Sequence, residues 1–274
     1  MELSPLSRWL TTLVGILFAL LGAVLFFLPN WAAPSFPWKV TPLVAMTMGG
    51  WYLGSAAYAL ETARRWRWSL TYPFLLFLWP FSLLESGLLL LHRSVLHLAT
   101  PLGWPYVLTL AIAALVAVVG LVDRARRQPV MSSDTAAVPG GAHVAALAFV
   151  FFVSFLGVVG LSGRFGSGAT IFPEPLTVLT VRAFGAFYLS LAISTLPLIW
   201  EQRIALWRLY ARVALAPLVL VTLAALIHLD RFDFARRPGE LLYIGAYLIV
   251  GIVTVIFLLA VRPAPKAETA RSVV

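Results

Sequence analysis

Glu85 and Arg182 are the ionisable residues that lie well inside the apolar stretches of this sequence. An ionised side chain at such depth is costly in a bilayer, so it usually faces the interior of a helix bundle and marks a functional position. Glu85 lies seven residues before the predicted helix end at His92. Arg182 lies seven residues after the predicted start of another helix at Pro175. Both groups then lie about 10 Å below one membrane boundary, and we predict an ion pair. This pair either clamps the structure or lines a cavity in which Glu85 changes protonation or Arg182 holds an anion.

His92 and His228 occupy equivalent places near the ends of two apolar stretches. Two imidazoles on either side of a symmetry axis are able to ligate one haem iron or a divalent metal. The simpler interpretation is a pair of interfacial polar residues, because no further cluster of His, Asp or Glu lies beside them at ligand spacing. Asp230 and Asp233 are the nearest additional oxygen ligands. We therefore expect no metal and no cofactor, and no haem absorbance in the purified protein.

The composition is that of a membrane protein. Of 274 residues, 61% are hydrophobic and 11% are charged, whereas soluble domains carry about 25% charged residues. The chain has no cysteine, which excludes disulfides, thiolate metal sites and a cysteine nucleophile. It also lacks the short motifs of nucleotide-binding proteins, serine hydrolases and zinc proteases, so we expect no enzyme. The net charge of +9 does not indicate a nucleic-acid partner, because the basic residues lie in short segments between apolar runs.

The apolar runs predict an all-α integral membrane protein with about eight transmembrane helices. Each run is long enough to cross about 30 Å of hydrocarbon, and none shows the two-residue alternation of a β-barrel strand. Lys and Arg are more frequent on the side of the N-terminus, which predicts a cell-membrane protein with both termini in the cytoplasm. The predicted spans are 9–28, 42–61, 69–91, 104–122, 143–161, 175–199, 206–228 and 240–261.

The two halves of the chain resemble each other. Gly49–Ala56 (GGWYLGSA) aligns with Gly185–Ala192 (GAFYLSLA), 136 positions later. We therefore predict two tandem four-helix repeats in parallel orientation, related by a pseudo-twofold axis along the membrane normal. The predicted boundaries are 1–122 for the first repeat, 123–142 for a cytoplasmic linker, 143–262 for the second repeat and 263–274 for a cytoplasmic tail.

Small residues spaced four apart occur at matching places in the two halves. They are Gly50 and Gly54 in the first half, and Ala186 and Ser190 in the second. Such residues let two helix backbones approach closely, so we predict helix-packing faces. The run Arg64–Trp68 (RRWRW) mixes cations with indoles, and we predict that it anchors a helix end at the lipid headgroups.

Two functions remain open from the sequence. The first is a non-catalytic membrane scaffold or accessory subunit, whose partners are the lipid bilayer and other membrane proteins. It is favoured because the spans hold almost none of the polar groups that a hydrophilic path needs. The second is a small transporter with an outer-facing cavity between the repeats, favoured by the duplication and by Pro80 and Pro217 inside the spans. A haem- or quinone-binding subunit depends on His92 and His228 alone.

Overall fold

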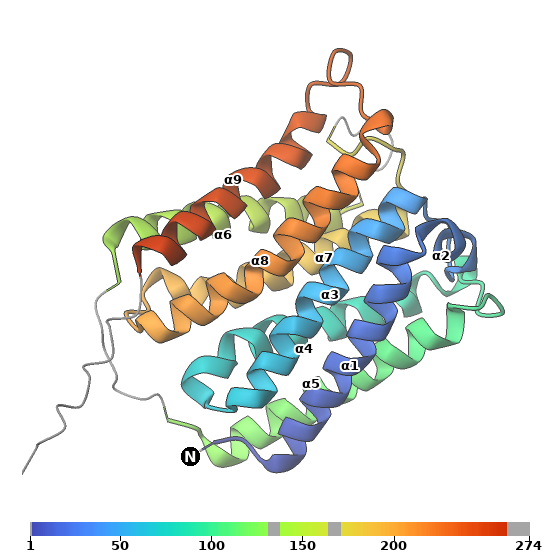
Figure 1. Ribbon diagram of the computed structural model, residues 1–274. Helices are drawn as coiled ribbons and strands as arrows, with labels where there is room; N and C mark the ends of the chain where they lie inside the picture. The colour runs from blue at the N-terminus through green and yellow to red at the C-terminus, as the bar shows by residue number, and fades with distance from the viewer. Residues whose placement is uncertain (1, 131–137, 164–170, 262–274) are drawn as a thin grey trace, which may run out of the picture.

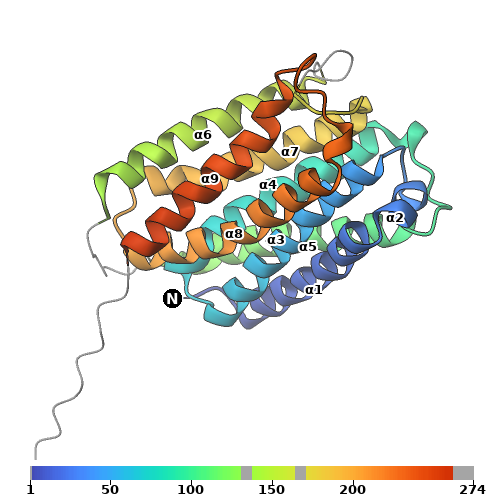
Figure 2. The ribbon, with the colours of Figure 1, turned by 45° about the horizontal axis from the view of Figure 1, so that its top comes forward.

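The computed structural model describes residues 2–130, 138–163 and 171–261. In these ranges the long helices run side by side (Figure 1), with α1 and α5 on one flank of the bundle and α6 and α9 on the other (Figure 2). The described α-helices are α1 (Pro5–Phe27), α2 (Pro29–Ser35), α3 (Pro42–Arg65), α4 (Trp68–Leu91), α5 (Gly103–Arg127), α6 (Gly140–Leu161), α7 (Val178–Thr195), α8 (Ile204–Ile227) and α9 (Glu240–Ala260). Three short 3-10 helices accompany them: η1 (Arg93–Val95), η2 (Leu196–Ile199) and η3 (Leu229–Arg231).

Within the described residues, 7 helices are long and apolar enough to cross a membrane. They are α1, α4, α5, α6, α7 with η2, α8 and α9, so the prediction of a multi-pass helical membrane protein in contact with the bilayer is confirmed. The second predicted span, α3, has 24 residues but is less apolar. It lies in the centre of the bundle against α1, α2, α4 and α8, and most of its side chains are buried. A helix covered by protein does not need the apolar outer surface that lipid requires.

Residues at the helix ends determine where the helices begin and end. Ser4, Thr41 and Thr177 precede α1, α3 and α7, and each side-chain oxygen accepts a first-turn backbone N–H at 3.2 Å. Such caps satisfy donors that have no partner inside the helix. α3 and α5 end before Trp66 and Gln128, which adopt left-handed conformations with φ of 33° and 42°. Arginines in the last turn of both helices complement the negative end of the helix dipole.

Helices pack in matching pairs in the two halves. α1 packs on α3 and α6 on α7, whereas α4 packs on α5 and α8 on α9. Across the halves, α3 packs on α8, and α4 packs on α7. α3 and α7 begin 136 residues apart, at Pro42 and Val178, and α8 begins and ends at the same offset from α4. We refer to the contact among α3, α4, α7 and α8 as the joint.

Several predicted boundaries are corrected by the structure. α5 continues to Arg127 and α6 begins at Gly140, so helices enter the predicted linker 123–142 from both ends. α7 begins at Val178 and not at 175. The short helix α2 was not predicted, because its seven residues are too few for a periodic pattern. Residues 131–137 of the linker and the predicted tail 263–274 lie outside the described residues.

The aromatic residues of the RRWRW run do not face lipid headgroups as predicted. Trp66 and Trp68 are 6% and 7% exposed and lie within the protein. The Trp66 indole donates a hydrogen bond to the Leu3 carbonyl at 3.2 Å, and the Arg124 guanidinium lies 5.6 Å from the Trp68 ring. The exposed indoles belong instead to Trp9, Trp31, Trp104 and Trp200.

Candidate functional site

Glu85 lies on α4 inside the joint and is 2% exposed. The Tyr106 hydroxyl, from α5, donates a hydrogen bond to Glu85 Oε2 at 3.4 Å, and the Tyr106 ring meets the Tyr52 ring of α3 edge-on, with ring centroids 6.4 Å apart. The carboxyl group lines a small cavity with a volume of about 20 Å³. A space of that size holds about one water molecule. The site therefore provides a buried acid beside two phenols, with little room for a ligand.

Aromatic rings from three helices close this cavity. Trp51 of α3 stacks on Phe187 of α7, with ring centroids 4.1 Å apart and planes inclined by 7°. The edge of Phe184 meets Trp51 at 4.6 Å, and Phe81 of α4 stacks on Phe77 at 5.3 Å. Each such pair adds about 0.5–1.5 kcal/mol beyond the burial of its surface. Packing of rings thus fixes the joint at the level of Glu85.

Hydroxyl groups attach α9 to the joint. Thr47 of α3 and Tyr243 of α9 share a hydrogen bond of 2.8 Å. The Trp51 indole donates to the Tyr247 hydroxyl at 3.0 Å, and Tyr188 of α7 lies 3.2 Å from the same oxygen. Because a buried hydroxyl without a partner is costly, these bonds determine how α9 is rotated about its own axis.

Arg182 lies in the second turn of α7 and reaches His92, which follows the last residue of α4. The Nη1 atom of Arg182 lies 2.8 Å from His92 Nε2. Because arginine only donates, Nε2 accepts, and the neutral imidazole carries its proton on Nδ1. Partial burial and the adjacent guanidinium lower the pKa of His92. The ring is therefore neutral at pH 7 and keeps Nδ1–H as a donor.

The predicted ion pair between Glu85 and Arg182 is absent from the described residues. Glu85 is bonded to Tyr106, and Arg182 is bonded to His92. α7 begins at Val178, later than predicted, so Arg182 lies nearer the membrane boundary than Glu85 does. Its long side chain reaches toward that boundary, as cationic side chains of membrane helices commonly do. A ligand-binding role for either residue stays a prediction.

His228 follows α8 as His92 follows α4. Its Nε2 is buried and has no hydrogen-bond partner in the part of the chain that the structure describes. In the same part, no group of three or more His, Cys, Asp and Glu side chains is placed to hold a metal. Because His92 Nε2 is already bonded to Arg182, the geometry does not favour a haem held between the two histidines. The expectation of no cofactor stays a prediction.

Gly50 and Gly54 lie where α3 crosses α8. A Cβ atom at Gly54 would lie 2.5 Å from Pro217, and one at Gly50 would lie 3.2 Å from an α8 side chain. The two backbones therefore approach too closely for a larger residue at position 54. On α7, Ala186 and Ser190 are fully buried, and the Ser190 hydroxyl donates to the Ala186 carbonyl at 2.7 Å.

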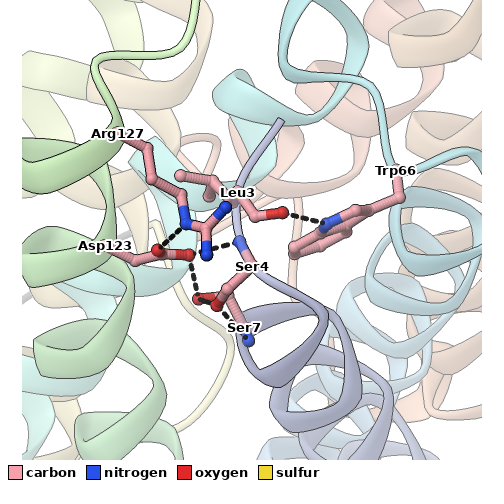
Figure 3. Close-up of polar contacts among 6 residues, drawn as sticks. All are labelled: Leu3, Ser4, Ser7, Trp66, Asp123 and Arg127. Atoms are coloured by element: carbon pink, nitrogen blue, oxygen red, sulfur yellow. Dashed lines mark hydrogen bonds and ion pairs between the residues drawn. The ribbon is translucent and has the colours of Figure 1, made fainter. Parts of the chain in front are cut away.

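A polar cluster that the sequence analysis missed lies near the N-terminus, around Asp123 of α5 (Figure 3). One Asp123 carboxylate oxygen accepts the Ser4 backbone N–H at 2.5 Å and the Ser7 hydroxyl at 2.7 Å, and the other accepts Arg127 Nε at 2.7 Å. The Trp66 indole holds the adjacent Leu3 carbonyl. The cluster thus ties the segment before α1 to α5 and to the end of α3.

We expect Asp123→Asn to lower the free energy of unfolding by about 1–3 kcal/mol. The Asn amide has one acceptor oxygen where the carboxylate has two, so at least one of the three donors loses its hydrogen bond. Thermal unfolding in detergent measures this loss, and faster protease cleavage before α1 reports release of the segment. Asp230→Asn is the matched control, since that side chain is 72% exposed. Equal unfolding temperatures for the two variants would contradict a structural role for the cluster.

Glu201, just before α8, forms a second polar contact that the sequence analysis missed. Its carboxylate binds the Arg203 guanidinium and accepts the Tyr72 hydroxyl at 3.2 Å. The hydrogen bond from Arg203 holds the pKa of Glu201 below its usual range. Its contribution to stability is therefore present above the ordinary carboxyl pKa and is lost as the pH falls through the lowered value. This contact joins the starts of α4 and α8.

Comparison of the chain with protein-family models, with curated proteins and with solved structures gives no match. A function therefore has to be argued from the geometry of the residues themselves. Three features bear on function: the cavity beside Glu85, the contact between Arg182 and His92, and the aromatic packing in the joint.

Proposed function

We propose that this multi-pass membrane protein consists of two copies of one four-helix unit, the first running from α1 to the end of α5 at Arg127 and the second from the start of α6 at Gly140 to α9. Equivalent glycines in the two units make equivalent contacts, which supports the proposal. A Cβ at Gly22 would meet the backbone nitrogen of Leu53 at 2.8 Å, and a Cβ at Gly157 would meet that of Leu189 at 2.7 Å. Leu189 follows Leu53 by the same 136 positions that separate α3 from α7. Independent helix pairs have no reason to repeat this detail.

The stacked rings in the joint support a twofold relation between the units. Trp51 and Phe187 are equivalent positions, 136 residues apart, and they contact each other. A residue that touches its own equivalent lies beside the symmetry axis. Because each unit has an even number of long helices, both units keep the same orientation, and the axis runs along the membrane normal.

The proposed role of this duplicated protein is that of a non-catalytic membrane scaffold or accessory subunit. The observation that carries it is the joint, where interlocked rings leave a cavity of about 20 Å³. A carrier needs its halves to separate around a solute, and separating these rings would expose a large apolar surface at each turnover. A rigid joint instead presents fixed outer helices to lipid and to other membrane proteins.

The orientation in the cell membrane follows from charge. The last turns of α3 and α5 carry arginines on the side where the described chain begins and ends (Figure 1). Cationic residues that flank membrane helices mark the cytoplasmic side. We therefore assign the N-terminus and the end of α9 to the cytoplasm.

A small proton-coupled transporter is the second candidate. It is favoured by Glu85, a buried carboxyl group between the two units, and by Pro80 and Pro217 within α4 and α8. A carboxyl that changes protonation beside a bent helix is a recurring arrangement in transporters.

Distances between spin labels separate the two candidates. The chain has no cysteine, so cysteines introduced for labelling need no background removal. Labels at Ala99→Cys and Ala235→Cys measure the distance between the two halves at the end of the bundle opposite the N-terminus. Labels at Arg64→Cys and Gln202→Cys measure the distance between the halves at the N-terminal end. For a scaffold we expect one narrow distance distribution for each pair in liposomes, unchanged between pH 8 and pH 5.

Opposite changes at the two ends would overturn the scaffold proposal, because alternating access opens one end while it closes the other. If such changes appear on acidification and disappear in Glu85→Gln, the transporter assignment replaces it. Leu83→Gln is the control for Glu85→Gln, since Leu83 lies on the same helix and is 44% exposed.

A further inference from the structure

A larger cavity lies at the end of the bundle opposite the N-terminus, where α4 ends and α7 begins. Its volume is about 270 Å³. We call it the distal pocket; its wall includes Lys39, His92 and His97 from the first half of the chain, and Thr177, Val178 and Leu179 from the second. The Trp38 indole, also in the wall, donates to Thr180 at 3.0 Å and fixes the two sides relative to each other.

Among the described residues, the charged and titratable ones in the wall of the distal pocket are all basic. Lys39 and His97 are exposed at the cavity, and His92 offers its Nδ1–H because Arg182 occupies its Nε2. The Arg182 guanidinium adds a positive charge behind His92, and its Nε is buried without a hydrogen-bond partner among the described residues. No carboxylate is among the described residues that line this wall. An anion entering the pocket therefore meets several donors, and none of the described residues that line it carries a negative charge.

The start of α7 adds to this field. Val178 and Leu179 are its first two residues, and their backbone N–H groups have no acceptor inside the helix. The Thr177 hydroxyl already caps Thr180, so it does not compete for those two groups. The positive end of the helix dipole thus points toward the cavity, an arrangement that favours phosphate groups.

We propose that the distal pocket binds a phosphate group, held by Lys39, His97, His92 and the first N–H groups of α7. The pocket lies at the level where membrane helices end, so two sources supply this chemistry: the headgroup of an anionic phospholipid, or a soluble phosphate from outside the bilayer. This binding is independent of the scaffold proposal, because it requires only the residues of the pocket.

Binding is tested on the full chain purified in an uncharged detergent. Native mass spectrometry with dioleoyl phosphatidylglycerol, and with dioleoylglycerol as the lipid lacking phosphate, measures lipid binding; titration calorimetry with inorganic phosphate measures the soluble source. The double variant Lys39→Gln/His97→Gln removes two donors whose side chains make no described contact, so it should fold. Arg93→Gln is the control, because Arg93 is exposed beside His92 but does not line the pocket.

We expect the double variant to bind its phosphate ligand about tenfold more weakly than the wild type, and Arg93→Gln to bind it within about twofold. Preference for phosphatidylglycerol over dioleoylglycerol supports a lipid headgroup, whereas binding of inorganic phosphate supports the soluble source. Absence of both, or equal affinities for the wild type and the double variant, overturns the proposal.

Discussion

Gly49→Ala and Gly185→Ala are each expected to destabilise the protein by about 3 kcal/mol or more, because the added methyl groups overlap with backbone. A Cβ at Gly49 would lie 2.6 Å from the Phe26 nitrogen of α1, and a Cβ at Gly185 would overlap with the Leu161 nitrogen of α6. Backbone atoms within a helix cannot move aside as the end of a flexible side chain does. Thermal unfolding in detergent, together with the yield of monodisperse protein, measures the loss.

Gly245→Ala and Gly251→Ala on α9 are the matched controls, because a Cβ at either position has no neighbour within 4 Å. Replacing such a helical glycine by alanine should stabilise the protein by less than about 1 kcal/mol. Similar losses at Gly49 and Gly185 are also what the proposed duplication predicts, since it makes the two residues equivalent. If only one of the two variants unfolds, the crossings of α1 with α3 and of α6 with α7 are not equivalent.

Trp51→Ala and Phe187→Ala are the second pair with large expected effects. Each removes a buried ring, with a cost of about 3–5 kcal/mol. The double variant should cost less than the sum of the single variants by about 1 kcal/mol, because the stacking between the rings is lost only once. Equilibrium unfolding of the four proteins of this cycle gives the coupling.

Trp104→Ala controls for the general effect of removing an aromatic ring, since Trp104 is 57% exposed. Its unfolding temperature should stay close to that of the wild type. A coupling energy near zero between Trp51 and Phe187 would contradict the view that the joint is held by their contact.

The sequence predicted the helices well, because long apolar runs have few alternatives in a bilayer. It also located Gly50 and Gly54, since small residues at helical spacing indicate a close approach. It did not predict the partner of Arg182. The predicted start of α7 was too early, so Arg182 lies nearer the membrane boundary than expected. The arginine side chain is also longer than one helical turn, so it contacts a residue at a different depth from its own Cα.

Contacts between segments that are far apart in the chain could not be predicted from the sequence. Asp123 binds Ser4 and Ser7, which are more than a hundred residues away, and no local pattern links them. Trp66 and Trp68 have the composition of an interfacial anchor, yet neighbouring helix ends cover them. Burial at a helix end depends on tertiary packing, which residue types alone do not specify.

The central position of α3 has a consequence for how the chain enters the membrane. A segment rich in Gly, Ala, Thr and Tyr partitions into lipid less readily than its neighbours, because polar groups raise the free energy of insertion. Its contact with α1 is available as soon as both have been synthesised, whereas its contact with α8 must wait until most of the chain has been translated. We therefore expect α3 to enter the bilayer as the second arm of a hairpin with α1, and the face that packs on α8 to stay uncovered until α8 has been synthesised.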